Sequence, residues 1–450
     1  MNVMVLILAA GKGTRMKSEK PKVLFEAAGK PMIDYAVEAA EDAGIKDINV
    51  VIGSGAELVQ EHLGDKVNYF EQVNQKGTGD AVMSAVKKIE NFNGKVLILC
   101  GDMPLISSDT LNRFMELTTA PVAFISAKVK DPKGYGRVIR GIDESVIKIV
   151  EEKDATEDEK RVNEINTGIY LCDSAELVNR LKNINNDNAQ GEYYLTDIVA
   201  TGTEAFLAPD DKEFLGVNNR AHLAEAAGQI WRKRAEEHLM NGVSVLAPDN
   251  FYCDDDVLIE EDVTIYPNVF LETGTIIRKG AVIYPGCRIK KSEIGANCEI
   301  KDNCLIQESF VGKDSQIGPM AQLRPGSVLK GENKLGNFVE TKKIEMGLGS
   351  KASHLTYLGD AEIGKDVNIG CGTITCNYDG INKYKTIIGD GVFVGSDVQL
   401  VAPVEIGKGA LIAAGSTITK EIPADALGIT RAEQRNIEGW VSKWKKKKGK

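Results

Sequence analysis

The feature that most constrains this chain is a six-residue spacing of aliphatic residues in its second half. After Pro248 an Ile or Leu stands at nearly every sixth position, and the period restarts at Ile294, Val311 and Ile388 and continues to Ile418. A period carried this far is typical of a parallel β-helix, in which each hexapeptide supplies one short strand and one inward aliphatic side chain. We therefore predict a β-helix whose unfinished outer faces favour self-association.

The first 217 residues have a different rhythm. Short apolar runs at 3–8, 48–52, 95–99 and 122–125 alternate with stretches that have helical spacing, such as 32–43 and 79–89. This alternation is the pattern of a mostly parallel sheet covered by helices. The first half is therefore predicted to be a Rossmann-like α/β domain.

The segment between the two halves is predicted to be one long helix. It contains no proline, places Leu223, Ala227, Ile230 and Leu239 on roughly one face, and ends at Asn241-Gly242. The predicted domains are thus 1–218, a linker helix 219–241, and a β-helix with its tail, 242–450. The helix could equally be the last helix of the first domain.

Length and composition argue against a nucleic-acid-binding or membrane-spanning protein. A length of 450 residues suggests two domains, and a net charge of −10 argues against a nucleic-acid binder, which needs a surplus of basic residues. The N-terminal apolar run at 3–10 is far shorter than the roughly 18 residues of a membrane span. Eight scattered cysteines without a Cys-x-x-Cys pair read as reduced thiols. We expect a cytoplasmic protein with no stable membrane association.

A glycine-rich loop follows the first predicted strand. Leu8-Ala9-Ala10-Gly11-Lys12-Gly13-Thr14-Arg15-Met16 places glycines where backbone amides can approach a phosphate. The loop lacks the third glycine of the dinucleotide fingerprint and the ending of a P-loop. A tight strand-to-helix turn is the commoner cause of Gly-x-Gly, but Arg15 and Lys22 add two cations near the loop.

Two further positions carry chemistry. Gly101-Asp102 ends a strong apolar strand, where open parallel sheets place their ligands, so Asp102 is a candidate for Mg²⁺ rather than only a turn residue. In the second half, the six-residue period breaks at 330–358 and 376–386, and we expect these segments to leave the shaft and carry function. The first contains His354, a candidate base, whereas the other three histidines fall in predicted helices.

The longer patterns resemble a known family. Around the glycine loop the chain resembles sugar nucleotidyltransferases, and further segments are similar to those of the bacterial bifunctional N-acetylglucosamine-1-phosphate uridylyltransferases/glucosamine-1-phosphate acetyltransferases, over nearly the whole chain. These segments are Gln72 with Gly77-Thr78-Gly79, Gly134-Tyr-Gly136-Arg137, Glu151 before Lys153, Glu164-Ile-Asn166-Thr-Gly168, Asn188 to Asp197 and Gly216-Val-Asn218-Asn219. The resemblance implies a left-handed β-helix, a homotrimer with acetyltransfer sites between subunits, and a role in cell-envelope synthesis.

The resemblance also implies a role for each matching residue in the first half. The loop with Leu8, Ala9, Ala10, Gly11 and Gly101 would hold UTP, while Arg15 and Lys22 offset the charge of the leaving pyrophosphate. The uracil edge would be read by Gln72, Gly77 and Thr78. The sugar and its N-acetyl group would contact Gly136, Glu151 and Asn166, and Mg²⁺ would be held by Asp102 and Asn218.

In the second half the resemblance makes His354 the general base that accepts the proton of the attacking amine. Phosphate contacts would come from Arg324, Lys342 and Tyr357, and sugar contacts from Asn368 and Asn377. The acetyl-CoA site would comprise Tyr378, Cys371, Ser396, Ala414 and Arg431. The chain departs from the family's common pattern at Cys371, usually alanine, and at Thr430, usually serine, which puts coenzyme affinity in doubt rather than the chemistry.

Two alternatives remain open at this point. The β-helix could serve assembly or regulation while only the first domain catalyses transfer to another sugar phosphate. Alternatively, the chain could be a non-catalytic scaffold, since certain translation-factor exchange subunits share this domain order. The basic end of the chain, from Lys443, reads most simply as a solvated tail.

Overall fold

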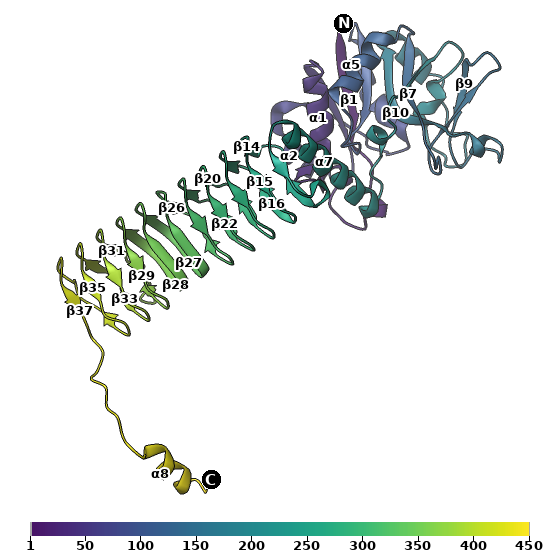
Figure 1. Cartoon of the computed structure of the whole chain (residues 1–450). Coiled ribbons are helices and arrows are strands. Elements are labelled where there is room, and N and C mark those ends of the chain that lie inside the picture. Colours follow the sequence, from purple (N-terminus) through teal and green to yellow (C-terminus); the bar gives the residue numbers. More distant parts are fainter. Residues whose placement is uncertain (1, 450) are drawn as a thin grey trace. The chain divides into compact units, whose positions relative to one another are not determined.

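The computed structural model describes residues 2–449 and divides into two compact units, Met1–Ile230 and Trp231–Lys450. Helix α7 (Arg220–Met240) carries the chain from one unit into the next and occupies the segment predicted as a linker helix (Figure 1). Of its four predicted apolar-face residues, Leu239 is exposed and Leu223 is only half-buried. No helix within 2–449 is long and apolar enough to cross a bilayer.

The first unit is built on a mixed sheet with the strand order β11-β7-β10-β6-β1-β4-β5, and a hairpin of β8 and β9 joins it at β10. The strands are β1 (Val3–Leu8), β4 (Asp47–Ile52), β5 (Asn68–Glu71), β6 (Lys95–Cys100), β7 (Val122–Lys128), β8 (Arg137–Arg140), β9 (Val146–Val150), β10 (Glu164–Asp173) and β11 (Glu204–Leu207). Neighbouring strands β6, β1, β4 and β5 are parallel, so their carboxyl ends meet at one edge of the sheet.

Helices cover both faces of this sheet, which confirms the predicted α/β class. Val5 and Ile7 of β1 pack on one face with α1, α2 and α5, whereas Met4 and Leu6 pack on the other with α3, α4 and α6. The helices are α1 (Met32–Asp42), α2 (Ala56–Leu63), α3 (Thr78–Ser84), α4 (Val86–Glu90), α5 (Ser108–Leu117) and α6 (Ser174–Leu181). The single helix predicted over 79–89 is two, broken at Ala85.

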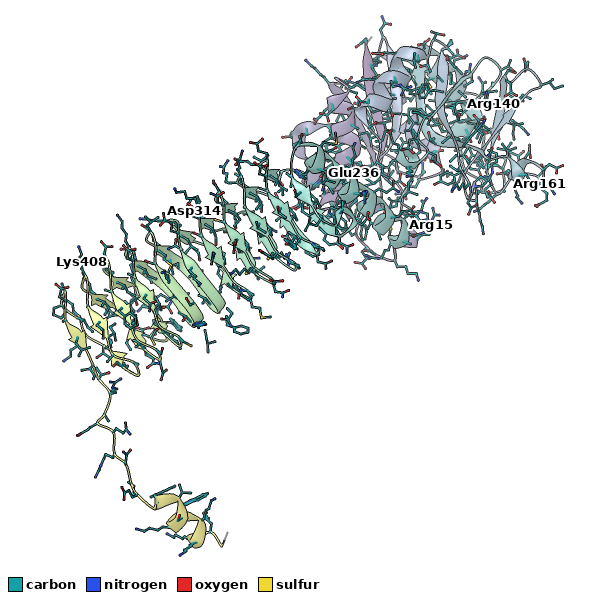
Figure 2. The ribbon with its side chains drawn as sticks, in the orientation of Figure 1. Arg15, Arg140, Arg161, Glu236, Asp314 and Lys408 are labelled. Atoms are coloured by element: carbon teal, nitrogen blue, oxygen red, sulfur yellow. The ribbon has the colours of Figure 1, made fainter. Side chains whose placement is uncertain are left out.

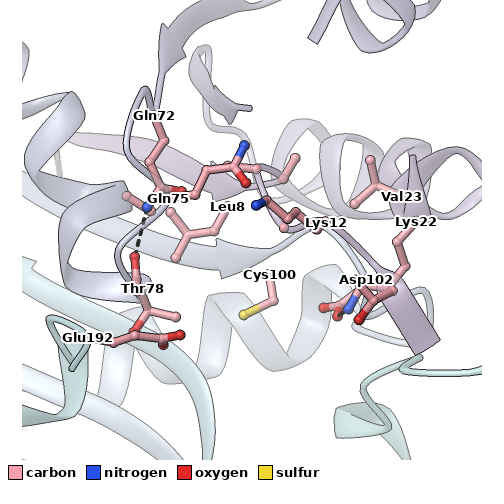
Figure 3. Close-up of a pocket in the computed structure, with 16 residues that line it drawn as sticks. Leu8, Lys12, Lys22, Val23, Gln72, Gln75, Thr78, Cys100, Asp102 and Glu192 are labelled. Atoms are coloured by element: carbon pink, nitrogen blue, oxygen red, sulfur yellow. Dashed lines mark hydrogen bonds and ion pairs between the residues drawn. The ribbon is translucent and has the colours of Figure 1, made fainter. Parts of the chain in front are cut away.

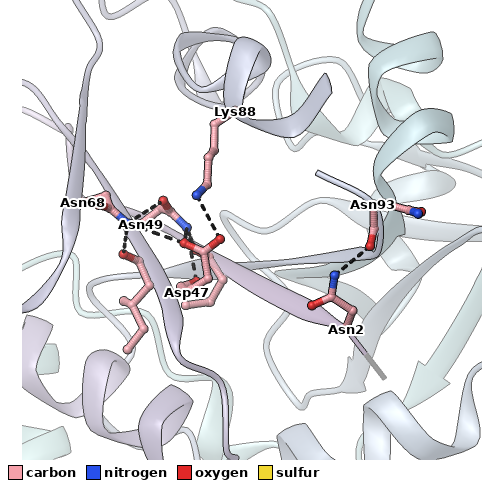
Figure 4. Close-up of polar contacts among 8 residues, drawn as sticks. Asn2, Asp47, Asn49, Asn68, Lys88 and Asn93 are labelled. Carbon is pink, nitrogen blue, oxygen red and sulfur yellow. Dashed lines mark hydrogen bonds and ion pairs between the residues drawn. The ribbon is translucent and has the colours of Figure 1, made fainter. Parts of the chain in front are cut away.

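A polar network ties β4 to its neighbours near the edge of the sheet (Figure 4). Asn49 is fully buried, and its Nδ2 donates to the carbonyl oxygen of Val5 at 3.1 Å. Lys88 forms an ion pair with Asp47 at 3.0 Å between Nζ and Oδ2. Because the Asn49 amide has acceptors although it is buried, the network anchors the start of β4.

The second unit is a left-handed parallel β-helix, as predicted (Figure 1). Its coils have three faces. The first holds β12 (Ser244–Val245), β15 (Thr264–Ile265), β18 (Val282–Ile283), β21 (Glu299–Ile300), β24 (Gln316–Ile317), β29 (Asn368–Ile369), β32 (Phe393–Val394), β35 (Leu411–Ile412) and β37 (Leu427–Gly428). The second holds β13 (Phe251–Cys253), β16 (Val269–Glu272), β19 (Arg288–Lys290), β22 (Leu305–Gln307), β25 (Gln322–Leu323), β30 (Ile374–Cys376), β33 (Gln399–Val401) and β36 (Thr417–Ile418). The third holds β14 (Leu258–Ile259), β17 (Ile276–Ile277), β20 (Glu293–Ile294), β23 (Phe310–Val311), β26 (Ser327–Leu329), β31 (Thr386–Ile388) and β34 (Val404–Ile406).

The aliphatic residue of each hexapeptide fills the shaft. Ile265, Ile283, Ile300 and Ile317 follow one another on the first face, and all four are fully buried. Polar side chains lie at the outer corners, as Figure 2 shows for Asp314 and Lys408. Each coil therefore buries its apolar side chains only by stacking on its neighbours.

The first break in the period does not leave the shaft, so that prediction is wrong. Residues 330–358 fall largely in β27 (Lys334–Met346) and β28 (Lys351–Ile363), two long strands that bend across all three faces. Leu335, Ile344 and Met346 are buried in the core. The inward positions keep the register of the neighbouring coils, and the aliphatic pattern fades because Thr341 and Ala352, both fully buried, stand at two of them. The second break is a true loop between β30 and β31.

Candidate functional sites

A cavity of about 550 Å³ lies in the first unit where β1 and β6 end and the loop after β5 begins. Figure 3 shows Lys22 and Asp102 at one end of it and Gln72 and Thr78 at the other. Its lining includes these predicted residues: Leu8, Ala9, Ala10, Gly11, Lys22, Gln72, Gly77, Thr78 and Asp102. Gly101 adjoins it, since its N–H donates to the Leu8 carbonyl at 3.0 Å.

The glycine loop needs glycine for steric reasons. Gly13 has a φ of 57°, and a Cβ there would approach the Lys22 Cβ to 2.8 Å. The loop and the segment at 21–22 can therefore pack closely enough to bring Lys22 into the cavity. Lys22 is also the ion-pair partner of Asp102. The side chain of a residue larger than glycine would displace this pair.

Both predicted metal ligands are held by basic side chains. Asp102 contacts Lys22, and the Arg15 guanidinium donates to Asn218 Oδ1 at 2.8 Å. The N–H of Val217 donates to the backbone carbonyl of Asp102 at 2.9 Å, which holds the two ligand segments side by side. The structure thus brings together all four residues predicted for the metal and for charge neutralisation.

At the other end of the cavity the loop after β5 is closely packed. Gly77 has a φ of 105°, and a Cβ there would lie 2.5 Å from the backbone oxygen of Tyr193. Thr78 Oγ1 accepts a hydrogen bond from the Leu195 N–H at 3.0 Å. Gln75, which sequence reasoning missed, also lines the cavity, and its buried Oε1 has no partner among residues 2–449. An unpaired buried acceptor points to a donor supplied by a ligand.

The three predicted sugar-binding residues form a separate group. The Asn166 N–H donates to the Gly136 carbonyl at 2.9 Å, and a Cβ at Gly136 would lie 3.5 Å from Glu151 Oε1. Thr196 Oγ1 donates to the same Glu151 oxygen at 3.1 Å. Burial raises the pKa of Glu151, although this hydrogen bond opposes the shift. The group reaches the cavity through Gly168, which bonds to Asn166 and contacts cavity-lining Cys100.

In the second unit, His354 lies on β28 at the corner between the first and second faces. Its Nδ1 lies 3.3 Å from Asn337 Oδ1, and β27 places Asn337 directly beside it in register. Since an amide oxygen only accepts, Nδ1 carries the hydrogen and Nε2 is left as the basic nitrogen. The exposed His354 ring is therefore available to accept a proton.

The predicted phosphate-binding cations gather at the next corner, between the second and third faces. Arg324 directly follows Leu323, which is paired with Thr341, so Arg324 and Lys342 occupy matching positions in adjacent coils. Arg324 also forms an ion pair with Glu340 at 2.8 Å. Tyr357 lies on the second face between this corner and His354.

Lys383 is a further basic residue at this corner, and sequence reasoning missed it. Its nearby charge lowers the pKa of Lys342. Lys383 is paired with Tyr378 across the loop after β30, and Asn377 donates to Asp360 beneath it. The sequence contained the signal, because a lysine lies within the second break of the repeat.

The predicted acetyl-CoA residues form a column that begins at His354. Ala352, Ile369, Val394 and Ile412 are paired in successive coils, and the residue two positions after each is His354, Cys371, Ser396 and Ala414. Arg431 closes the column, since its Nη1 donates to the Ala414 carbonyl at 2.8 Å. Cys371 is exposed. Asn368 lies on the first face, in the same coil as Cys371.

Within one chain, no hydrogen bond or ion pair of the described residues joins His354 to Arg324 or Lys342. The base and the coenzyme column occupy one corner of the coils, and the cations and Tyr378 occupy another. The predicted acetyltransfer residues are therefore assembled as two groups rather than one.

Comparisons with known proteins match both halves of the chain to transferase families and related domains. The nucleotidyl transferase family matches residues 4–212, a GMPPB C-terminal domain matches 253–344, and the bacterial transferase hexapeptide family matches 385–420. The bifunctional protein GlmU of Geobacter sulfurreducens is 49% identical over 98% of both chains. GlmU of Pelobacter propionicus is 49% identical over 99% of both, and that of Caldanaerobacter subterraneus 50% identical over 98% of both. The chain therefore belongs to the GlmU family of bifunctional proteins.

Proposed function

We propose that each unit carries one of the two activities of a bifunctional transferase for UDP-N-acetylglucosamine synthesis. The second unit acetylates glucosamine-1-phosphate with acetyl-CoA, and the first transfers a uridylyl group from UTP to N-acetylglucosamine-1-phosphate. The observation that carries the proposal is the segregation of the two residue sets. The cavity with its basic and acidic end belongs wholly to the first unit, and the His354 column belongs wholly to the second.

In the first unit the sugar phosphate attacks the α-phosphorus of UTP. A phosphorus–oxygen bond to the sugar phosphate forms as the bond to pyrophosphate breaks, so no protein nucleophile is needed. Lys22 lines the end of the cavity opposite the base-reading loop, and Arg15 bonds to Asn218 in the segment that is hydrogen-bonded to Asp102 at the same end. Both cations are proposed to offset the charge of the leaving pyrophosphate. The unpaired oxygen of Gln75 supports a nucleotide in the cavity, because ribose hydroxyls and base N–H groups are donors.

The oxygen donors of Asp102 and Asn218 fit Mg²⁺. This ion takes few protein ligands and completes its shell with phosphate oxygens and water, and no cluster of three His, Cys, Asp or Glu suited to a metal occurs within residues 2–449. When bound, the ion would neutralise phosphate charge. Arg15 contacts Asn218 Oδ1 and Lys22 contacts Asp102, so both cations already lie beside the proposed metal ligands.

In the second unit the amine of glucosamine-1-phosphate attacks the thioester carbonyl. A carbon–nitrogen bond forms, the carbon–sulfur bond breaks, and His354 Nε2 accepts the amine proton. Asn337 holds the ring in the required tautomer. Coenzyme A is proposed to lie along the column of Cys371, Ser396, Ala414 and Arg431, and the sugar phosphate to contact the cations at the neighbouring corner.

The separation of base and cations supports a site shared between copies of the chain, and we propose a homotrimer. On the third face of the β-helix, the outward positions in register include exposed Leu258, Phe310 and Val328 and half-buried Ile276, with Glu293 between Ile276 and Phe310. Exposed apolar surface of this kind marks a contact face. A monomer by light scattering, with full acetyltransfer activity, would contradict this assembly. The substrates imply a cytoplasmic location.

Two assays test the division of labour on wild type, Asp102→Ala and His354→Ala. One measures pyrophosphate release from UTP and N-acetylglucosamine-1-phosphate with Mg²⁺, and the other measures thiol release from acetyl-CoA with glucosamine-1-phosphate. We expect Asp102→Ala to abolish only the first activity and His354→Ala only the second. Pyrophosphate without thiol release in wild type would make the β-helix a scaffold, and loss of both would favour a non-catalytic role.

A further inference from the structure

The carboxamide of Gln72 is held in one orientation by its neighbours. Its Nε2 donates to Asp80 Oδ2 at 2.8 Å and to the Gly77 carbonyl at 2.9 Å, so both amide hydrogens are engaged. Gln72 is only 6% exposed and lines the nucleotide cavity. Its Oε1 accepts no hydrogen bond from any residue within 2–449.

Neither neighbour can accommodate the reversed carboxamide. A backbone carbonyl and an ionised carboxylate are both acceptors without a hydrogen to give, so turning the amide would set Oε1 against two acceptors. Asp80 is itself fixed at the start of α3, because its Oδ2 also accepts from the Lys76 N–H at 3.0 Å. The Gln72 atom that remains free to contact a ligand is therefore Oε1, a hydrogen-bond acceptor.

We propose that Asp80 is a positioning residue that sets pyrimidine specificity through the orientation of Gln72. The inference rests on the proposed uridylyl transfer. Uracil carries a hydrogen on N3 and can donate it to Gln72 Oε1, whereas cytosine presents an unprotonated N3, which repels an acceptor. With Asp80 present, the cavity selects UTP over CTP; without it, only the Gly77 carbonyl still opposes the turned carboxamide, so the orientation that offers an N–H to cytosine becomes less unfavourable.

A purely structural role for Asp80 makes a different prediction. An acidic residue in the first turn of a helix stabilises the helix whatever the nucleotide. Loss of that contribution would lower turnover of UTP and CTP alike. The ratio of kcat/KM for UTP to kcat/KM for CTP separates the two roles, because a change in folded fraction cancels from it.

The experiment measures this ratio with N-acetylglucosamine-1-phosphate for wild type, Asp80→Ala and Asp80→Asn in the full chain. We expect Asp80→Ala to lower the ratio about tenfold, the order of one hydrogen bond to a charged group, with a fall for UTP and a rise for CTP. Asp80→Asn retains an oxygen at this position and should restore most of the preference. Asp109→Ala removes a first-turn acid from α5 instead and should leave the ratio unchanged.

A double-mutant cycle completes the test. In a Gln72→Leu background, removing Asp80 should no longer change the ratio, because the carboxamide that it orients is gone. An unchanged ratio in Asp80→Ala, or an equal change with and without Gln72, overturns the inference. If wild type instead shows no pyrophosphate release with UTP while thiol release proceeds, the proposed uridylyl transfer itself has failed. Thiol release by each variant confirms that the second unit is folded, and any change in the folded fraction of the first unit cancels from the ratio.

Discussion

Replacing Asn337 by alanine should slow acetyl transfer modestly and leave uridylyl transfer intact. The side chain of Asn337 accepts one hydrogen bond from His354 Nδ1 at 3.3 Å, a long bond between groups that are partly open to solvent. Such a bond contributes about 0.5–1.5 kcal/mol. At about 1.4 kcal/mol for each factor of ten, we expect kcat for thiol release to fall about two- to tenfold.

The loss expected for Asn337→Ala is much smaller than the loss expected for His354→Ala. Removing a general base costs about 10²- to 10⁴-fold, because the proton then has no positioned acceptor. Asn337→Ala should therefore retain at least a tenth of the wild-type rate of thiol release after the background rate is subtracted. Asn337→Asp keeps an acceptor for the Nδ1 hydrogen and should be less impaired than the alanine variant.

Thiol release from acetyl-CoA at saturating glucosamine-1-phosphate measures this effect, and pyrophosphate release by the same preparation reports the integrity of the first unit. Two results would refute the reasoning. An Asn337→Ala loss as large as that of His354→Ala would mean that Asn337 contacts substrate or that the strand has shifted. An unchanged rate would mean that the hydrogen bond does not set the tautomer.

Three further predictions test the core and the charges. Ile300→Ala empties a fully buried position in the shaft and should cost the β-helix about 2–5 kcal/mol, seen as a lower urea midpoint for its unfolding while pyrophosphate release is kept. Glu151→Gln removes a carboxyl group whose pKa is raised by burial. In wild type the protonated carboxyl stabilises the fold, and this contribution to stability is lost as pH rises from about 4.5 through the raised pKa. The thermal midpoint of the variant relative to wild type should therefore rise with pH across that window, and a flat difference would contradict the buried environment. Lys383→Met removes the charge that lowers the pKa of Lys342, so the alkaline loss of glucosamine-1-phosphate affinity, measured as KM against pH, should move to higher pH.

The sequence by itself determined both fold classes and most of the local elements. A six-residue aliphatic period has one low-energy solution, because each strand can bury its single inward side chain only by stacking on the next coil. Likewise, the apolar runs of β1 and β6 could lie only inside a sheet covered on both sides, and their ends fixed where the glycine loop and Asp102 would lie.

Tertiary structure alone decided how the site residues pair. Residues 330–358 lose the aliphatic pattern yet remain in the shaft, because the register of β27 and β28 buries Thr341 and Ala352 at positions that other coils fill with larger aliphatic residues. The pairing of Asp80 with Gln72, the nearness of Lys383 to Lys342, and the division of His354 from the cations depend on which loop meets which coil. Spacing along a chain does not encode such contacts, since they arise from side chains that approach in space only after both elements have packed.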